Sequence, residues 1–197
     1  MPAPAKLNLE RILTESIRLL RDEGLEEVTL RKLAGRLGVE APSLYRHIGG
    51  KRQLQTLMVL RLFRMQLDQV GAHDSWQEWL TVFGHVLWNT QGSIRDCARL
   101  VLTAGFERED LEVMAGWVAE ALAPYGINAQ TALEIQLAIQ ALILGLVGLA
   151  EGPSKGSMRA AIPFDAVLDH SLGAMIAGWE TRLSRLERPE ANAPGRL

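Results

Sequence analysis

The side chains best suited to contact a polyanion gather in one short stretch of the sequence, residues 41–51. Its polar members are Ser43, Tyr45, Arg46, His47 and Lys51. Hydroxyl and cationic groups donate hydrogen bonds to phosphate oxygens, and an arginine can also reach guanine in the major groove of DNA. Ala41 and Pro42 could contact a thymine methyl group. These residue types favour DNA as the ligand.

Two short predicted helices would position these side chains. Thr29 is a typical N-cap for the first helix, which ends at Gly38, and Pro42 suits the first turn of the second. Gly38 can adopt positive φ in the turn between them. On the second helix only Leu44 and Ile48 share an apolar face, so its other side chains should point outward. This arrangement is typical of a helix-turn-helix.

The charges of the sequence are divided unevenly between its two parts. Residues 1–64 carry 12 lysines and arginines against 7 acidic residues, a net charge of +5, whereas residues 65–197 carry 9 against 16, a net charge of −7. Residues 31–64 hold eight bases and only Glu40 as an acid. The N-terminal part should therefore attract polyanions. The residues placed to contact the DNA backbone on either side of the second helix are Thr29, Arg31 and Lys51.

Glycine and proline separate apolar runs of helical period, and no stretch alternates apolar and polar residues as a strand would. The chain is therefore predicted to be all-α, with nine to ten helices. Ser93 and Asp96 are expected to cap a sixth helix, and residues 152–157 are expected to form a mobile loop. The other predicted helices lie at 9–23, between Thr29 and Gly38, and at 42–48, 52–70, 76–89, 110–125, 129–151 and 164–187.

Other kinds of chemistry find little support in the sequence. It has no glycine-rich phosphate loop, no Gly-x-Ser-x-Gly motif and no His-Glu-x-x-His motif, so an enzyme is not expected. His73, His85 and His170 have no partner at metal-ligand spacing, so neither a metal nor another cofactor is expected. Cys97 is the only cysteine and could sense oxidants or electrophiles, although a buried, inert thiol is the favoured interpretation.

Several motifs occur together without gaps in residues 9–57. They are Gly24-Leu25, Thr29-Leu30-Arg31-Lys32-Leu33-Ala34, Leu37-Gly38-Val39, Pro42-Ser43-Leu44-Tyr45-Arg46-His47 and Lys51. Together they resemble the DNA-binding domain of the tetracycline-repressor (TetR) family. The resemblance implies three N-terminal helices, with the third in the major groove, and a fourth that links them to a ligand-binding and dimerisation domain. It also implies that the last two long helices pair with their copies in a four-helix bundle.

Farther along the chain, Ser75-Trp76-Gln77-Glu78-Trp79-Leu80 and Arg95-Asp96 are similar to the start of the effector domain in the tetracycline repressors themselves. The resemblance aligns Val101 with the histidine that binds the magnesium of a tetracycline chelate in those repressors. Their neighbouring polar drug contacts fall near Leu67 and Phe83, and a tryptophan of their recognition helix is Arg46 here. A different effector and a different operator sequence are therefore expected.

Large aromatic side chains are concentrated in the C-terminal two-thirds of the sequence. Their helical spacing fits ordinary core packing, but they could also line an apolar ligand cavity in which glutamines supply polar groups. The candidate effector-binding residues are Trp79, Phe83, Trp88, Met114, Trp117, Gln136, Gln140 and Met175. If they bind a ligand, its expected class is a small apolar or aromatic molecule.

The two last long helices combine apolar residues on most faces with small ones such as Gly145, Gly148 and Gly173. A single chain cannot easily cover such helices, whereas a two-fold homodimer can. A dimer also suits two recognition helices that read a pseudo-palindromic operator. The expected organisation is a DNA-binding domain at 1–51, a connecting helix at 52–73, an effector-binding and dimerisation domain at 74–188 and a flexible tail at 189–197.

The sequence thus predicts a transcriptional regulator that binds double-stranded operator DNA as a homodimer. Repression is favoured, because a dimer bound over a promoter blocks polymerase by occupancy, and a small-molecule effector would release it. The alternative is a dimeric regulator without such an effector, whose C-terminal half serves dimerisation or protein partners. A membrane partner is not expected, because no apolar run reaches the roughly 18 residues of a spanning helix. Residues 1–9 do not resemble a secretory signal, which favours the cytoplasm.

Overall fold

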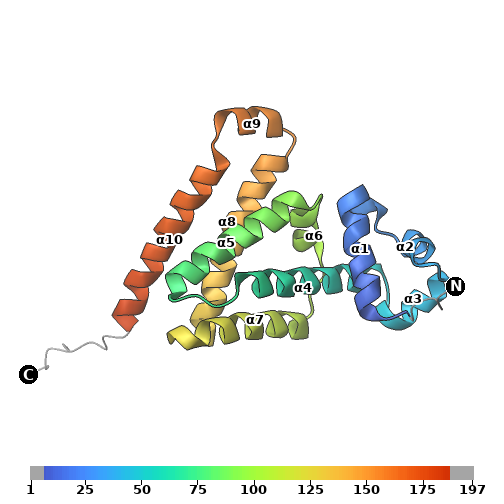
Figure 1. Cartoon of the computed structure of the whole chain (residues 1–197), viewed down its shortest axis with the longest axis horizontal. Coiled ribbons are helices and arrows are strands. Elements are labelled where there is room, and N and C mark those ends of the chain that lie inside the picture. Colours follow the sequence, from blue (N-terminus) through green and yellow to red (C-terminus); the bar gives the residue numbers. More distant parts are fainter. Residues whose placement is uncertain (1–6, 187–197) are drawn as a thin grey trace, which may run out of the picture.

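The computed structural model describes residues 7–186, and all regular secondary structure in that range is helical, which confirms the all-α prediction. Figure 1 shows α1 to α3 at one end of the molecule and α10 at the other. The helices are α1 (Leu9–Glu23), α2 (Leu30–Leu37), α3 (Ala41–Ile48), α4 (Lys51–Val70), α5 (Trp76–Ser93), α6 (Cys97–Thr103), α7 (Arg108–Leu122), α8 (Ala129–Glu151), α9 (Lys155–Ala161) and α10 (Phe164–Leu186).

Side-chain caps fix where several of these helices begin. A cap satisfies one of the backbone N–H groups that the first helical turn leaves without a partner. Four polar residues, each directly before a helix that the sequence predicts, act in this way, since each accepts a hydrogen bond from the backbone N–H three residues later: Asn8, Thr29, Ser75 and Asn128. Local sequence alone therefore sets the start of α1, α2, α5 and α8.

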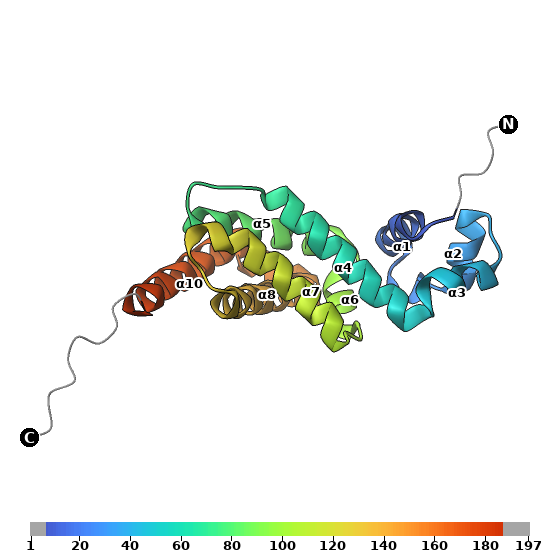
Figure 2. The same cartoon turned by 90° about the horizontal axis from the view of Figure 1, so that it is seen from below.

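The described residues form two hydrophobic cores, and α4 belongs to both. Leu54 and Met58, in its first half, are fully buried with α1 to α3. Phe63 and Leu67, in its second half, are buried against α5, α7 and α8. Figure 2 shows α4 running from the N-terminal helices into the larger helical layer. The packing around α1 to α3 continues past residue 51, where the sequence predicts a domain boundary.

The Asp96 carboxylate joins α6 to the N-terminal helices, and Arg99 of α6 also pairs with Glu26 at 2.9 Å. The N–H of Leu25 donates to Asp96 Oδ2 at 2.8 Å, and Arg99 lies 3.5 Å from the same oxygen. Asp96 has a φ of 58°, the one positive φ outside glycine in the described range. Gly24 has a φ of 92°, and a Cβ there would lie 2.7 Å from Asp96 Oδ2. The junction therefore requires glycine at position 24.

This junction corrects the expected start of the sixth helix. Ser93 was predicted to open it, but Ser93 is the last residue of α5, and its hydroxyl donates to the carbonyl of Thr90 at 3.2 Å. Asp96 does precede α6, yet its side chain makes no capping bond to that helix. The carboxylate is engaged by Leu25 instead.

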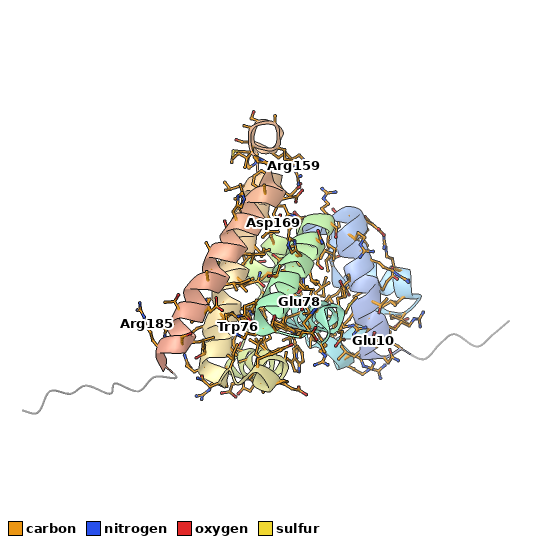
Figure 3. The ribbon with its side chains drawn as sticks, turned by 60° about the vertical axis from the view of Figure 1, so that its left-hand side comes forward. Glu10, Trp76, Glu78, Arg159, Asp169 and Arg185 are labelled. Carbon is orange, nitrogen blue, oxygen red and sulfur yellow. The ribbon has the colours of Figure 1, made fainter. Side chains whose placement is uncertain are left out.

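The expected mobile loop at residues 152–157 is also wrong in part, because α9 begins at Lys155. Arg159 of α9 turns back to the end of α8, where its Nε donates to the carbonyl of Ala150 at 3.1 Å and its guanidinium pairs with Glu151 (Figure 3). These bonds give partners to the Ala150 carbonyl and the Glu151 carboxylate at the C-terminal end of α8, and they hold α9 against that end. The tail predicted at 189–197 lies outside the described residues.

Candidate functional site

Helix α3 presents most of its side chains to the outside, as a reading helix must. Only Leu44 and Ile48 are buried on it. Gly38, in the left-handed region with a φ of 67°, ends α2 and makes the turn, and a proline occupies the first turn of α3. Tyr45 is 53% exposed, so its ring and its hydroxyl group are accessible to a partner. The exposed residues of α3 are Pro42, Tyr45, Arg46 and His47, and the half-buried ones are Ala41 and Ser43.

The other predicted DNA contacts lie at the ends of the neighbouring helices. Thr29 is half-buried, and its hydroxyl oxygen caps α2 by accepting from the Lys32 N–H at 3.3 Å. Arg31, in the first turn of α2, and Lys51, at the start of α4, are both exposed. The structure thus brings the nine predicted residues to α3 and to the helix starts on either side of it.

Ion pairs divide the eight bases of residues 31–64 into two groups. Arg31, Arg46 and Lys51 are exposed and have no ion pair within residues 7–186. The other five each lie within 4 Å of a carboxylate: Lys32 by Glu23 and Glu27, Arg36 by Glu15, Asp22 and Glu23, Arg52 by Glu107, Arg61 by Glu10, and Arg64 by Asp68. The bases left for a polyanion are therefore the three predicted to contact DNA.

Hydrogen bonds in the paired group also shift the pKa values of its members. Lys32 donates to Glu23, which lowers the pKa of that carboxyl and raises the pKa of Lys32. A bond from Arg36 to Asp22 raises the pKa of the guanidinium. All three groups stay charged at neutral pH and offset one another, so they add little to the field that a distant phosphate experiences.

A cavity of about 560 Å³ lies between the two cores, within the size range of small-molecule sites. Side chains of α4, α6, α7 and α8 form most of its wall, with one residue of α5. Its apolar and cysteine lining residues are Val59, Leu62, Phe63, Cys97, Val101, Phe106, Leu111, Met114, Ala115, Leu133 and Leu137. Its polar lining residues are Gln66, Gln91, Arg108, Glu112, Gln136 and Gln140.

Three of the predicted effector-binding residues line this cavity, and five do not. Met114 reaches it from α7, and Gln136 and Gln140 reach it from one face of α8. Of the positions that the tetracycline-repressor resemblance singled out, Val101 lines the cavity, whereas Leu67 is buried in the core.

Core packing accounts for the five aromatic and methionine positions that lie elsewhere. Trp79 and Phe83 are buried with ring centroids 5.0 Å apart, and the Trp79 indole donates to the carbonyl of Gly71 at 3.1 Å. Trp117 stacks on a phenylalanine of α4, and Trp88 donates to an aspartate of α10 at 3.0 Å. Met175 is half-buried against the same core. Sequence spacing predicted their burial but not the side of the helix on which a cavity would open.

Two of the histidines that were considered as metal ligands, and Cys97, lie away from α3 and contact other groups of the protein. The ring of His73 lies 2.9 Å from the carbonyl of Val70, and His85 lies 3.2 Å from Asp169. No group of three potential metal ligands occurs among the described residues. Cys97 is 1% exposed, and burial raises the pKa of its thiol to about 12. The thiolate needed for a fast reaction with an electrophile is therefore disfavoured.

Sequence reasoning missed several residues of the cavity wall. Gln66 and Gln91 are 4% and 3% exposed, and Phe106 follows α6 in the chain. The two glutamines each interrupt an apolar helix face, which is a signal that the sequence already contained. Phe106 lies outside any helix, so no periodicity marks it.

The chain is similar to known proteins along its N-terminal third and in its whole fold. Residues 12–55 match the model of bacterial regulatory proteins of the tetR family. The tetracycline repressor protein class D of Escherichia coli is 36% identical over 78 residues, 39% of this chain and 36% of that repressor. The match thus spans about a third of the length of that relative.

Solved structures extend the similarity of fold to most of the chain. A TetR variant from Acinetobacter baumannii AYE in complex with minocycline has a TM-score of 0.70 at 24% identity, over 93% of this chain and 100% of that one. The class A TetR in complex with 5a,6-anhydrotetracycline and magnesium has a TM-score of 0.65 at 24% identity, over 89% and 99% of the two chains. Residues 12–55 thus match a tetR-family regulatory domain, and the chain as a whole shares the fold of the TetR structures.

The burial of Cys97 yields a prediction about thiol labelling. Iodoacetamide should label the folded protein slowly, and the rate should still rise as the pH passes 9 instead of levelling off there, because the pKa of the buried thiol is raised to about 12. Unfolding in urea should make labelling fast, with the pH dependence of a free thiol. Mass spectrometry of the Cys97 peptide measures both rates. Fast labelling of the folded protein that levels off above about pH 8.5 would instead show an accessible, reactive cysteine.

Proposed function

We propose that this protein is a DNA-binding transcriptional repressor that acts as a homodimer and is released from its operator by a small molecule. The observation that carries the proposal is the difference between the bases that have an acidic partner and the bases that have none. Arg31, Arg46 and Lys51 have no acidic neighbour within ion-pair distance in the described part of the chain, and they lie on or beside an outward-facing α3. A positive group without an internal partner gains most from a phosphate.

The exposed face of α3 supplies the contacts that would read the operator. In the major groove Arg46 would donate to guanine, and Tyr45 and Ser43 would donate to phosphates. Arg31 and Lys51 would hold the backbone on either side and fix the depth of the helix. Operator choice then depends mainly on α3, and overall affinity depends mainly on the flanking bases.

Helices α8 and α10 supply the faces that a second copy would cover. Leu149 of α8 is 52% exposed. Small residues exposed on the two helices let a partner approach closely: Ala141, Gly145 and Gly148 on α8, and Gly173, Ala174, Ala177 and Gly178 on α10. A two-fold dimer through these faces would present two copies of α3 to one side of a DNA duplex.

Helix α8 is also long and apolar enough to cross a membrane, with a mean hydropathy of 1.9 over its most apolar 18 residues and 39% of them buried. Its buried side contributes Ile135, Ile139 and Ile143 to the core of a helical layer. We assign its exposed side to the partner copy. The protein then stays in the cytoplasm, where its operator lies.

The cavity between the two cores suits the effector that would release the operator. Val59 and Leu62 of α4 line it and also pack with the N-terminal helices. Cys97 of α6 also lines the cavity and packs with the N-terminal helices. It follows Asp96, whose carboxylate accepts a hydrogen bond from the Leu25 N–H. A ligand that shifts α4 or α6 would move α1 to α3 with them and change the spacing of the two reading helices. That change would weaken operator binding.

Replacing one free base should reduce DNA binding far more than replacing one paired base. Arg46→Ala removes a side chain predicted to contact a base and should weaken binding about tenfold or more. Arg64→Ala is the matched control, because Arg64 already lies 3.0 Å from Asp68. Fluorescence anisotropy with labelled DNA from beside its own gene, in excess competitor DNA, measures both variants. Equal losses for the two variants would remove α3 as the reading helix.

A charge on the small-residue face should separate the dimer. Ala141→Glu places carboxylates from both copies at the proposed interface, where they would lose water without a cationic partner. Sedimentation velocity should show a dimer for the wild-type protein and a monomer for this variant. Leu9→Glu is the control, since Leu9 is also exposed but lies on α1. A monomeric wild-type protein, or a dimeric Ala141→Glu variant, would contradict the proposed interface.

A further inference from the structure

We infer that the cavity takes an uncharged, mainly apolar ligand that donates a hydrogen bond to Gln91 and accepts one from Gln140. This inference rests on the proposed function, because it specifies the effector of that same cavity. Four glutamines from three helices line an otherwise apolar wall: Gln66 of α4, Gln91 of α5, and Gln136 and Gln140 of α8.

Two of these amides hold atoms that the protein leaves without a partner. Gln91 Oε1 and Gln140 Nε2 are buried and make no hydrogen bond within the described residues. Gln91 is only 3% exposed, so bulk water does not compensate its amide. A buried polar atom without a partner costs stability, and a leucine or methionine would pack there without that cost. One unpaired atom is an acceptor and the other a donor, which defines the complementary groups of the ligand.

The cavity wall also sets the charge of the ligand. Only Arg108 and Glu112 are charged among the lining residues. Arg108 Nε lies 2.6 Å from Glu112 Oε1, and the two side chains are 87% and 61% exposed, so this pair lies at the solvent side of the cavity. The interior thus holds neutral amides and apolar groups. An ionic ligand would lose its water there without an opposite charge to replace it.

The glutamine amides of the cavity wall also argue against a metal chelate as the ligand. Neutral amides are weak ligands compared with the carboxylates and imidazoles that hold divalent ions. The position that the resemblance aligns with a metal-binding histidine is Val101, and its side chain lines the cavity. The polar contacts available to a ligand are therefore hydrogen bonds to amides.

Two pairs of bicyclic probes test this inference in titrations that contain no DNA. In 2-quinolone and 4-quinolone a ring N–H accompanies a carbonyl group, and in coumarin and chromone a ring oxygen replaces that N–H. At least one quinolone should bind about tenfold more tightly than its oxygen counterpart, because only the quinolone can donate to Gln91 Oε1. The anion 1-naphthoate should bind more weakly than that quinolone. Isothermal titration calorimetry measures each dissociation constant.

Two variants separate the roles of the amides. Gln91→Met should abolish the preference for the quinolone over its oxygen counterpart and leave the oxygen compound's affinity nearly unchanged. Gln140→Met should weaken both by a similar factor, because both accept a hydrogen bond through the carbonyl group. Gln69→Met, at an exposed position of α4, is the control and should behave as the wild type. Thermal melts should show both cavity variants at least as stable as the wild type, since each loses an unpaired buried atom.

Three results would overturn the inference: no probe binding at millimolar concentration, tightest binding by 1-naphthoate, or an unchanged quinolone preference in Gln91→Met. None of them bears on operator binding, which the anisotropy assay measures without any ligand. Conversely, a protein that fails to bind DNA could still show the expected probe selectivity. The two proposals therefore fail independently.

Discussion

The hydrogen bond from the Leu25 N–H to the Asp96 carboxylate, 2.8 Å long, joins α6 to the segment that follows α1. It holds α6 against the N-terminal helices and places Leu100 in their core, while Cys97 and Val101 of α6 face the cavity. One short helix thus belongs to the packing of the N-terminal helices and to the wall of the cavity. Its seven residues cannot shift at the cavity without disturbing that packing.

Helix α4 makes the same connection over a longer distance. It is continuous from Lys51, beside the reading helix, to Val70, in the larger core. Helix α4 contains no proline or glycine, the usual causes of a sharp kink, so it can carry a displacement along its length. With α4 and α6 both shared, we expect the cavity and α3 to respond together, which is the physical requirement for release of an operator by a small molecule.

Local sequence predicted the features of the fold whose causes are local. Asn8, Thr29, Ser75 and Asn128 cap helices through bonds that span three residues, and the α3 face follows from the positions of two apolar side chains. The start of α6 was mispredicted because Asp96 bonds a residue 71 positions away. The cavity was only partly predicted for a related reason. Whether Trp79 or Gln91 faces the core or the cavity depends on packing between distant segments of the chain. Helical periodicity does not describe that packing.

Filling the cavity tests most directly whether it is coupled to the reading helices. Ala115→Phe would place a ring in the cavity, while Gly116→Ala, next to it on α7, adds a methyl group into open space. Operator affinity measured by fluorescence anisotropy should fall about tenfold in Ala115→Phe, within the range of allosteric couplings, and stay unchanged in Gly116→Ala. Equal affinity of the two folded variants would show that the cavity and α3 are not coupled, and the proposed release mechanism would be wrong.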